Sequence, residues 1–155
     1  MSSQPTLTRF LTMLAFAAFA IHAATIFQLM QEGAYVSGKF NLVVALAAAL
    51  AGWRIAGPRI EKGVLASVFA VLQGMIVAVL LACIAGATSE TFRLGHDTRY
   101  DDLGEAMEGF FGFITEHVRD LAVPKMLVPM AMFCLGAGLA LSITFRLLEA
   151  RRLAR

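Results

Sequence analysis

Hydrophobic residues in this chain gather into long runs that charged residues interrupt only at the ends. Charge-free runs cover residues 10–30, 64–87 and 127–145, and a shorter run over residues 40–56 carries Arg54 near its end. A helix needs about 20 apolar residues to cross the hydrocarbon of a bilayer, where each backbone polar group must be bonded within the segment. The pattern therefore predicts four membrane-spanning helices.

The first two runs each admit a second interpretation. The apolar centre of the second run, residues 42–53, is short enough for a buried or re-entrant helix, but Trp53 suits a membrane interface and Arg54 can reach lipid phosphate. The first run follows Arg9 and contains small residues, as a cleaved signal peptide would. Its apolar character continues to Met30, past such a cleavage site, so we expect it to be retained as a span.

A different period governs residues 102–121, between the third and fourth runs. Apolar residues recur there at helical spacing, while acidic residues fall largely elsewhere; the stripe is Leu103, Met107, Phe110, Ile114 and Leu121. This predicts an amphipathic helix that lies along the outer membrane surface or over the mouth of the bundle, and that ends before Pro124. The expected fold is an all-α membrane protein, a single domain over residues 1–155 with about four transmembrane helices and one amphipathic interfacial helix.

Composition supports lipid as the surrounding medium. The chain is 59% hydrophobic and 15% charged, against about 45–50% and about 25% in soluble domains. A net charge of +2 without a basic helix gives no reason to expect nucleic acid. Because the sequence holds no catalytic triad pattern, phosphate loop or dinucleotide fingerprint, we expect neither an enzyme nor a cofactor.

Lysine and arginine are unevenly shared between the two sides that four spans define. The side with both termini and the second connection carries 8 basic and 2 acidic residues, and the other side carries 5 basic and 9 acidic residues. Basic residues collect in cytoplasmic connections. We therefore expect both termini in the cytoplasm and the acidic third connection outside.

Small residues four positions apart allow helices to approach closely in lipid. The third run has an unbroken ridge of them: Ala66, Ala70, Gly74, Ala78, Ala82 and Gly86. Shorter series are Ala48, Gly52 and Ala56 in the second run, and either Gly136, Ala140 and Thr144 or Gly138 and Ser142 in the last. We expect the third helix to be central to packing, either within one chain or against a second copy or another membrane protein.

Few residues in the spans could carry chemistry. His22 lies near the middle of the first run, and we expect a neutral imidazole bonded to a neighbour such as Gln73, at similar depth in the third run. Met126, Met130 and Cys134 share a helix face, and with Cys83 they could hold a soft ion, although apolar packing is the simpler interpretation. On the outer side, His96 and His117 lack metal-ligand spacing and are expected to be solvated or interfacial.

One segment resembles a known family. Gly52-Trp53-Arg54 followed by Gly57-Pro58-Arg59 is similar to the GWR-x-x-GPR signature of the TrgA family of bacterial membrane proteins, named for tellurite resistance. The third connection is similar too, through Arg99-Tyr100-Asp101, Glu105-Ala106-Met107 and Phe110-Phe111, and Pro124, Gly136 and Gly138 resemble the family's final segment. The chain departs from the pattern where Asp102-Leu103 replaces a proline and where the last span lacks a Gly-Gly pair.

The resemblance implies a role in tolerance of tellurite at the bacterial cytoplasmic membrane, with no catalytic residues to carry over. Three mechanisms stay open: a scaffold or assembly partner, a transporter or exporter of an oxyanion, and a redox protein that uses its thiols. The small-residue ridge favours the scaffold, because a transport path would have only His22, Gln73, Ser67 and the inner arginines. We also expect Gly57 and Pro58 to form the turn of the inner connection.

Overall fold

The computed structural model describes residues 6–31, 35–61, 63–96 and 102–153, and every regular element in these ranges is helical. The elements are α1 (Thr6–Met30), α2 (Gly38–Ala51), the π-helical η1 (Gly52–Ala56), the 3-10 helical η2 (Gly57–Arg59), α3 (Val64–His96), α4 (Leu103–Leu121) and α5 (Pro124–Leu153).

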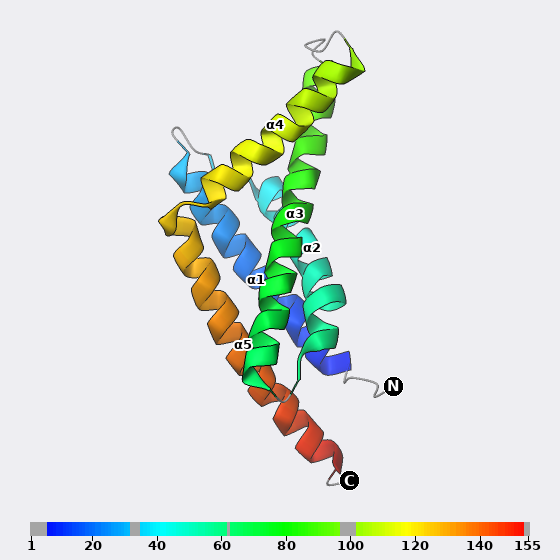
Figure 1. Ribbon diagram of the computed structural model, residues 1–155, viewed down its shortest axis with the longest axis vertical. Coiled ribbons are helices and arrows are strands. Elements are labelled where there is room, and N and C mark those ends of the chain that lie inside the picture. Colours follow the sequence, from blue (N-terminus) through cyan, green and yellow to red (C-terminus); the bar gives the residue numbers. More distant parts are fainter. Residues whose placement is uncertain (1–5, 32–34, 62, 97–101, 154–155) are drawn as a thin grey trace.

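Four of the helical segments are long and apolar enough to cross a membrane: Leu7–Met30, Gly38–Arg59, Val64–His96 and Pro124–Ala150. They lie side by side, and α4 crosses diagonally from the far end of α3 to the start of α5 (Figure 1). The second segment runs on through η1 and η2 to 22 residues, long enough to span. The predicted all-α membrane fold with four spans and one amphipathic helix is confirmed.

The helices are longer than the hydrophobic runs that predicted them. The third run ends at residue 87, but α3 continues to His96 and has 33 residues, a length of about 50 Å against a hydrocarbon thickness of about 30 Å. The last run ends at residue 145, whereas α5 continues to Leu153. Hydropathy identifies the residues suited to hydrocarbon, whereas backbone hydrogen bonds can continue a helix beyond those residues.

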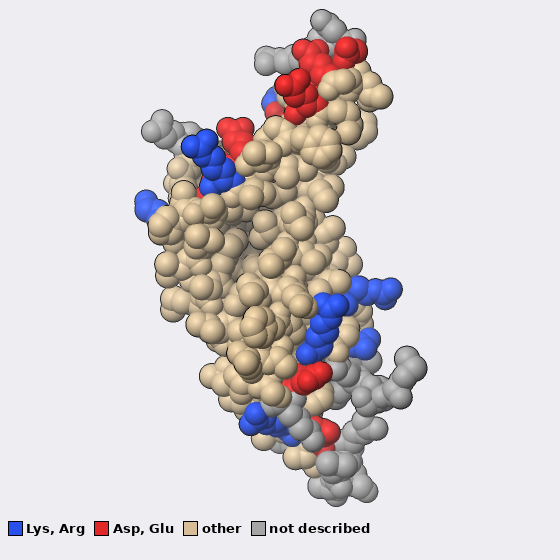
Figure 2. Space-filling model, in the orientation of Figure 1, with Lys and Arg blue, Asp and Glu red and all other residues tan. Residues whose placement is uncertain are grey.

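Charged side chains separate toward the two ends of the bundle. Acidic residues gather where α3 and α4 meet, and arginines gather toward the end where α1 begins and α5 ends (Figure 2). α4 begins at a cap, because the Asp102 carboxylate accepts a hydrogen bond from the Glu105 N–H at 2.8 Å. It ends at Leu121, and Pro124 opens α5, where a missing N–H costs nothing.

The connection between α2 and α3 differs from the prediction. Gly57 and Pro58 do not form the turn, because η2 continues the rod of α2 and η1 through Arg59. Ile60 then takes an extended backbone conformation, φ −68° and ψ 126°, and the direction changes between η2 and α3. Proline is tolerated in the first turn of a helical segment, so Pro58 does not stop the rod.

The third helix is central, as the small-residue ridge predicted. α3 packs against α2, η1, α4 and α5. Of the ridge, Ala70, Gly74 and Ala78 are buried, Ala82 and Gly86 are half-buried and Ala66 is exposed. In α5 the Gly138 and Ser142 series faces α3 and is buried, whereas Gly136 and Ala140 are exposed. The close packing seen here lies within one chain.

Polar side chains that hydropathy does not single out hold together the end of α1 and the start of α2. The Gln28 amide donates to the Asn41 side-chain oxygen at 2.6 Å, and the Asn41 amide donates to the Thr25 hydroxyl at 3.2 Å. The Ser37 N–H donates to the Gln28 side-chain oxygen at 2.6 Å. Because lipid offers these groups no partner, their mutual bonding fixes the hairpin.

Candidate functional site

The GWR–GPR segment divides into residues that face the bundle and residues that face outward. A Cβ on Gly52 would lie 3.0 Å from the Phe16 Cβ and from the Thr12 carbonyl oxygen. A Cβ on Gly57 would lie 3.1 Å from the Arg9 Cα. Both glycines are therefore needed because the backbone of this segment lies directly on α1.

A π-turn lies between the two glycines. The Gly57 N–H donates to the Gly52 carbonyl, five residues back, and closes a turn that holds one residue more than an α-turn. Ala56, at its end, is fully buried, and a Cβ on Gly74 of α3 would lie 2.9 Å from the Ala56 Cβ. The turn is thus fitted between α1 and α3, and π-turns of this kind are frequent at functional sites.

Phe16 of α1 packs between the π-turn, α3 and α5. Only 1% of it is exposed, and the tip of its ring lies 2.9 Å from the Cβ that would be added to Gly74. The ring also meets the Phe133 ring of α5 edge to face at a centroid distance of 5.4 Å. One aromatic side chain therefore contacts α3, α5 and the π-turn, which explains why glycine stands at positions 52 and 74.

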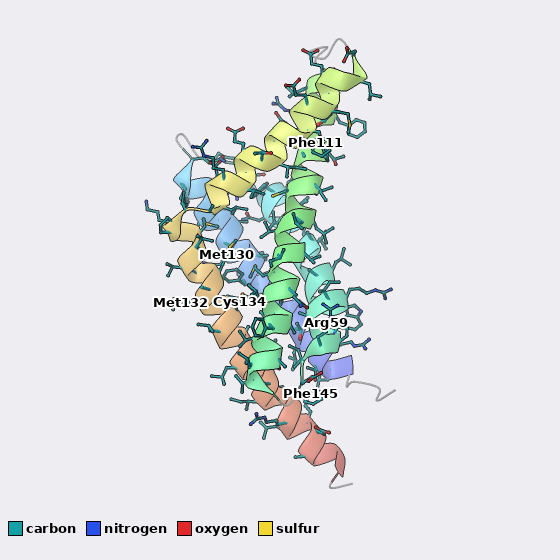
Figure 3. All side chains as sticks on the ribbon, in the orientation of Figure 1. Arg59, Phe111, Met130, Met132, Cys134 and Phe145 are labelled. Atoms are coloured by element: carbon teal, nitrogen blue, oxygen red, sulfur yellow. The ribbon has the colours of Figure 1, made fainter. Side chains whose placement is uncertain are left out.

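The arginines and the tryptophan of the segment lie on its other side. Arg54 and Arg59 are exposed and Trp53 is half-buried. The Arg59 guanidinium donates to the Gln73 side-chain oxygen on α3, and Arg59 lies near the outer edge of the bundle (Figure 3). Trp53 and Arg54 line a groove of about 450 Å³, completed by Val77 and Leu81 of α3 among others. The segment therefore presents cations at the surface.

Two serines tie the connection below the arginines to the bundle. The Glu61 carbonyl accepts hydrogen bonds from the Ser67 hydroxyl at 3.0 Å and from the Ser142 hydroxyl at 3.2 Å. The Glu61 N–H donates to the Ser67 oxygen at 3.2 Å, and Ile60 is fully buried beside them. The backbone that follows η2 is thus hydrogen-bonded to α3 and α5, which limits how far the arginine-bearing segment can move.

The residues of the family resemblance that lie on α4 are at the opposite end of the bundle from the GWR–GPR segment (Figure 1). Arg99, Tyr100 and Asp101 fall outside the described residues. The Glu105-Ala106-Met107 and Phe110-Phe111 segments lie on α4, far from η1 and η2 (Figure 1). The structure therefore does not bring the two halves of the motif together in one site.

The expected pair of His22 and Gln73 is wrong. His22 is exposed on the outer face of α1, two residues from each of Ala20 and Ala24, which are buried. Gln73 is also exposed, and its side-chain oxygen bonds Arg59 instead. Equal depth in the membrane says how high a residue lies along its helix but not in which direction its side chain points, so depth alone could not identify the partner of Gln73.

An apolar cavity of about 90 Å³ lies between α1, α2, α3 and α5, and α4 covers one end of it through Phe113, His117 and Leu121. His117 is half-buried, and its Nδ1 lies 3.0 Å from the Phe113 carbonyl, to which it donates. Its ring stacks on the Phe113 ring at 3.8 Å. Of the two positions foreseen for the amphipathic helix, the structure favours the one over the mouth of the bundle.

The methionines and cysteines meet in part. Met126 and Cys134 are buried and Met130 is half-buried. Met130 and Cys134 lie on the face of α5 that is turned toward the bundle (Figure 3). Cys83 of α3 lines the cavity with both methionines, whereas Cys134 belongs to the neighbouring core around Phe16. Over the described ranges, no group of three or more His, Cys, Asp or Glu residues is placed to hold a metal ion.

Carbon and sulfur dominate the lining of this cavity. Its polar side chains are Cys83 and His117, whereas the polar groups foreseen for an oxyanion path, His22, Gln73 and Ser67, lie elsewhere. The cavity can accommodate an apolar group, but it offers an anion no ring of donors.

Comparisons of this chain with protein-family models, with curated proteins and with solved structures gave no match. The resemblance to the TrgA family therefore stays a prediction from the sequence. From its own geometry, the chain is a multi-pass α-helical membrane protein whose GWR–GPR segment packs glycines inward and directs arginines outward.

Proposed function

We propose that this protein contributes to tellurite tolerance in the bacterial cytoplasmic membrane, without catalysis, as a packed helical scaffold that presents a cationic surface. The observation that carries the proposal is the arrangement of the GWR–GPR segment. Gly52 and Gly57 lie against α1, while Arg54 and Arg59 are exposed. Glycines in close contact and arginines left outside are the features expected of a segment that builds a surface for binding.

The orientation we propose places both termini and the GWR–GPR segment in the cytoplasm. Arginines gather at that end of the bundle and acids at the other (Figure 2), and basic residues prefer the cytoplasmic side. A test uses single cysteines in a background where Cys83 and Cys134 are serine. In intact cells a membrane-impermeant maleimide should label E108C but label R54C only after lysis, and the reverse pattern would invert the orientation.

The scaffold is better supported than a transporter. Lipid-buried transport paths are lined by polar or ionisable groups that pair with one another or with the cargo. Here the described interior is closed by aromatic rings and small residues, and the central cavity is apolar. Phe16, which contacts both α3 and α5 in this interior, is only 1% exposed.

The proposal is tested with a deletion strain and plasmid complementation. Loss of the gene should lower the tellurite concentration that cells survive, and the wild-type protein should restore it. The R54Q/R59Q double variant should restore it poorly, whereas K39Q, which removes an exposed charge at the opposite end of α2, should act as the wild type. Membrane levels of each variant are compared by immunoblot.

Two results would count against this function. Unchanged survival of the deletion strain would separate the protein from tellurite altogether. Lower accumulation of cellular tellurium when the protein is present, at equal reduction of tellurite, would support export and remove the scaffold interpretation.

A further inference from the structure

A groove beside the GWR–GPR segment combines apolar side chains with a cationic one. Its walls are Leu50, Trp53, Arg54 and Ile55 from α2 and η1, with Val77 and Leu81 from α3. Its volume is about 450 Å³, and the central cavity takes no part in it, since the two share no residue. Among these wall residues Arg54 is the charged one, so the groove combines a long apolar wall with one cationic position.

The polarity of the groove changes along its length. On α3, Gln73, Val77 and Leu81 follow one another at four-residue spacing and form one strip of the helix surface. Gln73 stands at the basic end, where its side-chain oxygen binds the Arg59 guanidinium. Leu50 and Arg54 are likewise one turn apart, so both walls run from a polar end to an apolar end.

Charge complementarity indicates what occupies the polar end. Within the described ranges, Arg54 has no ion-pair partner and Arg59 is bonded to a neutral amide. The acidic residue nearest to them in sequence is Glu61, whose backbone carbonyl accepts hydrogen bonds from Ser67 and Ser142. Trp53 and Arg54 line the groove together, and Arg59 is held at its end through Gln73. Guanidinium groups at a membrane boundary are suited to phosphate, which arginine binds through two parallel hydrogen bonds.

We propose that this groove binds one anionic phospholipid. Its phosphate lies between Arg54 and Arg59, and an acyl chain follows Leu50, Val77 and Leu81. A free oxyanion would use the arginines but leave the apolar wall without a role. The inference concerns lipid binding to the folded protein and does not depend on the proposed part in tellurite tolerance.

Native mass spectrometry of the detergent-solubilised protein tests the site with phosphatidylglycerol and, as a neutral lipid, phosphatidylcholine. Wild-type protein and K39Q should retain one phosphatidylglycerol in preference to phosphatidylcholine. R54Q/R59Q should bind it about tenfold more weakly or worse, because each basic group near a lipid surface adds substantially to anionic-lipid binding. Thermal unfolding in the same detergent verifies that each variant is folded.

A second variant separates a lipid from a free anion. L81W fills the apolar end of the groove without changing charge, and Leu81 is exposed, so the fold should tolerate the larger side chain. It should lose phosphatidylglycerol as R54Q/R59Q does. Equal lipid retention by wild type and both variants would overturn the proposal. So would displacement of the lipid by millimolar inorganic phosphate with L81W binding as wild type, which would mark an oxyanion site.

Discussion

Replacing Gly138 by alanine places a methyl group where no space exists between α3 and α5. The added Cβ would lie 2.6 Å from the Val68 Cγ2, 2.7 Å from the Val68 Cα and 3.0 Å from the Val68 nitrogen. Carbon atoms in contact are about 3.5–4.0 Å apart, so the two helices must separate by about 1 Å. Because two of the three atoms belong to the backbone, no change of side-chain rotamer relieves the overlap.

Gly136 provides the matched control on the same helix. No heavy atom lies within 4 Å of the Cβ that alanine would add there. G136A should therefore be neutral or gain up to about 1 kcal/mol from helix propensity. Overpacking at position 138 should cost about 1–3 kcal/mol, so the two variants should differ by about 1–4 kcal/mol in the free energy of unfolding.

The measurement is reversible unfolding in mixed micelles of increasing SDS content, followed by far-ultraviolet circular dichroism. G138A should unfold at a lower SDS fraction than the wild type, and G136A at the same fraction or a higher one. If the two variants unfold together, α3 and α5 do not approach as closely as the structure has them, and the packing argument fails.

Three further outcomes follow from the same geometry. F16A should lower the free energy of unfolding by about 3–5 kcal/mol, measured by the same SDS titration, whereas L14A on the exposed face of α1 should cost far less. Equal losses would contradict the packing of Phe16 between three elements. S67A should lower the free energy of unfolding by about 1–3 kcal/mol, because the buried Ser67 hydroxyl both donates to and accepts from the Glu61 backbone; unfolding at the wild-type SDS fraction would contradict that network. Serine at both cysteine positions should leave tellurite survival unchanged in the complementation assay, and reduced survival would indicate thiol chemistry.

The four spans and the amphipathic helix were predictable because lipid imposes a length and a period on the sequence. The π-turn was not, since its extra residue leaves no mark on hydropathy: Gly52 and Ala56 continue the four-residue series of an ordinary helix. The reversal after η2 was missed for a related reason. Gly57 and Pro58 are typical turn residues, yet the same two residues also fit close packing and the first turn of a 3-10 helix.

The candidate site was foreseen only in part. The motif residues were identified, but sequence alone could not separate Gly136 from Gly138, since both begin series of small residues four apart. Direction around the helix decides between them, and it depends on which neighbour is packed. For the same reason Phe16 gave no signal among the many apolar residues of its run, although it joins three elements.

The π-turn also sets the rotational phase of the chain that follows it. Each residue of an α-helix turns the chain by about 100°. Deleting one residue from η1 would therefore shorten η1 and also rotate η2 relative to α2. Arg59 would then swing away from Gln73, and Ile60 would leave its buried position. A single deletion here should therefore disturb the bundle more than a conservative substitution at any one of these positions, which makes the length of this segment a constraint of its own.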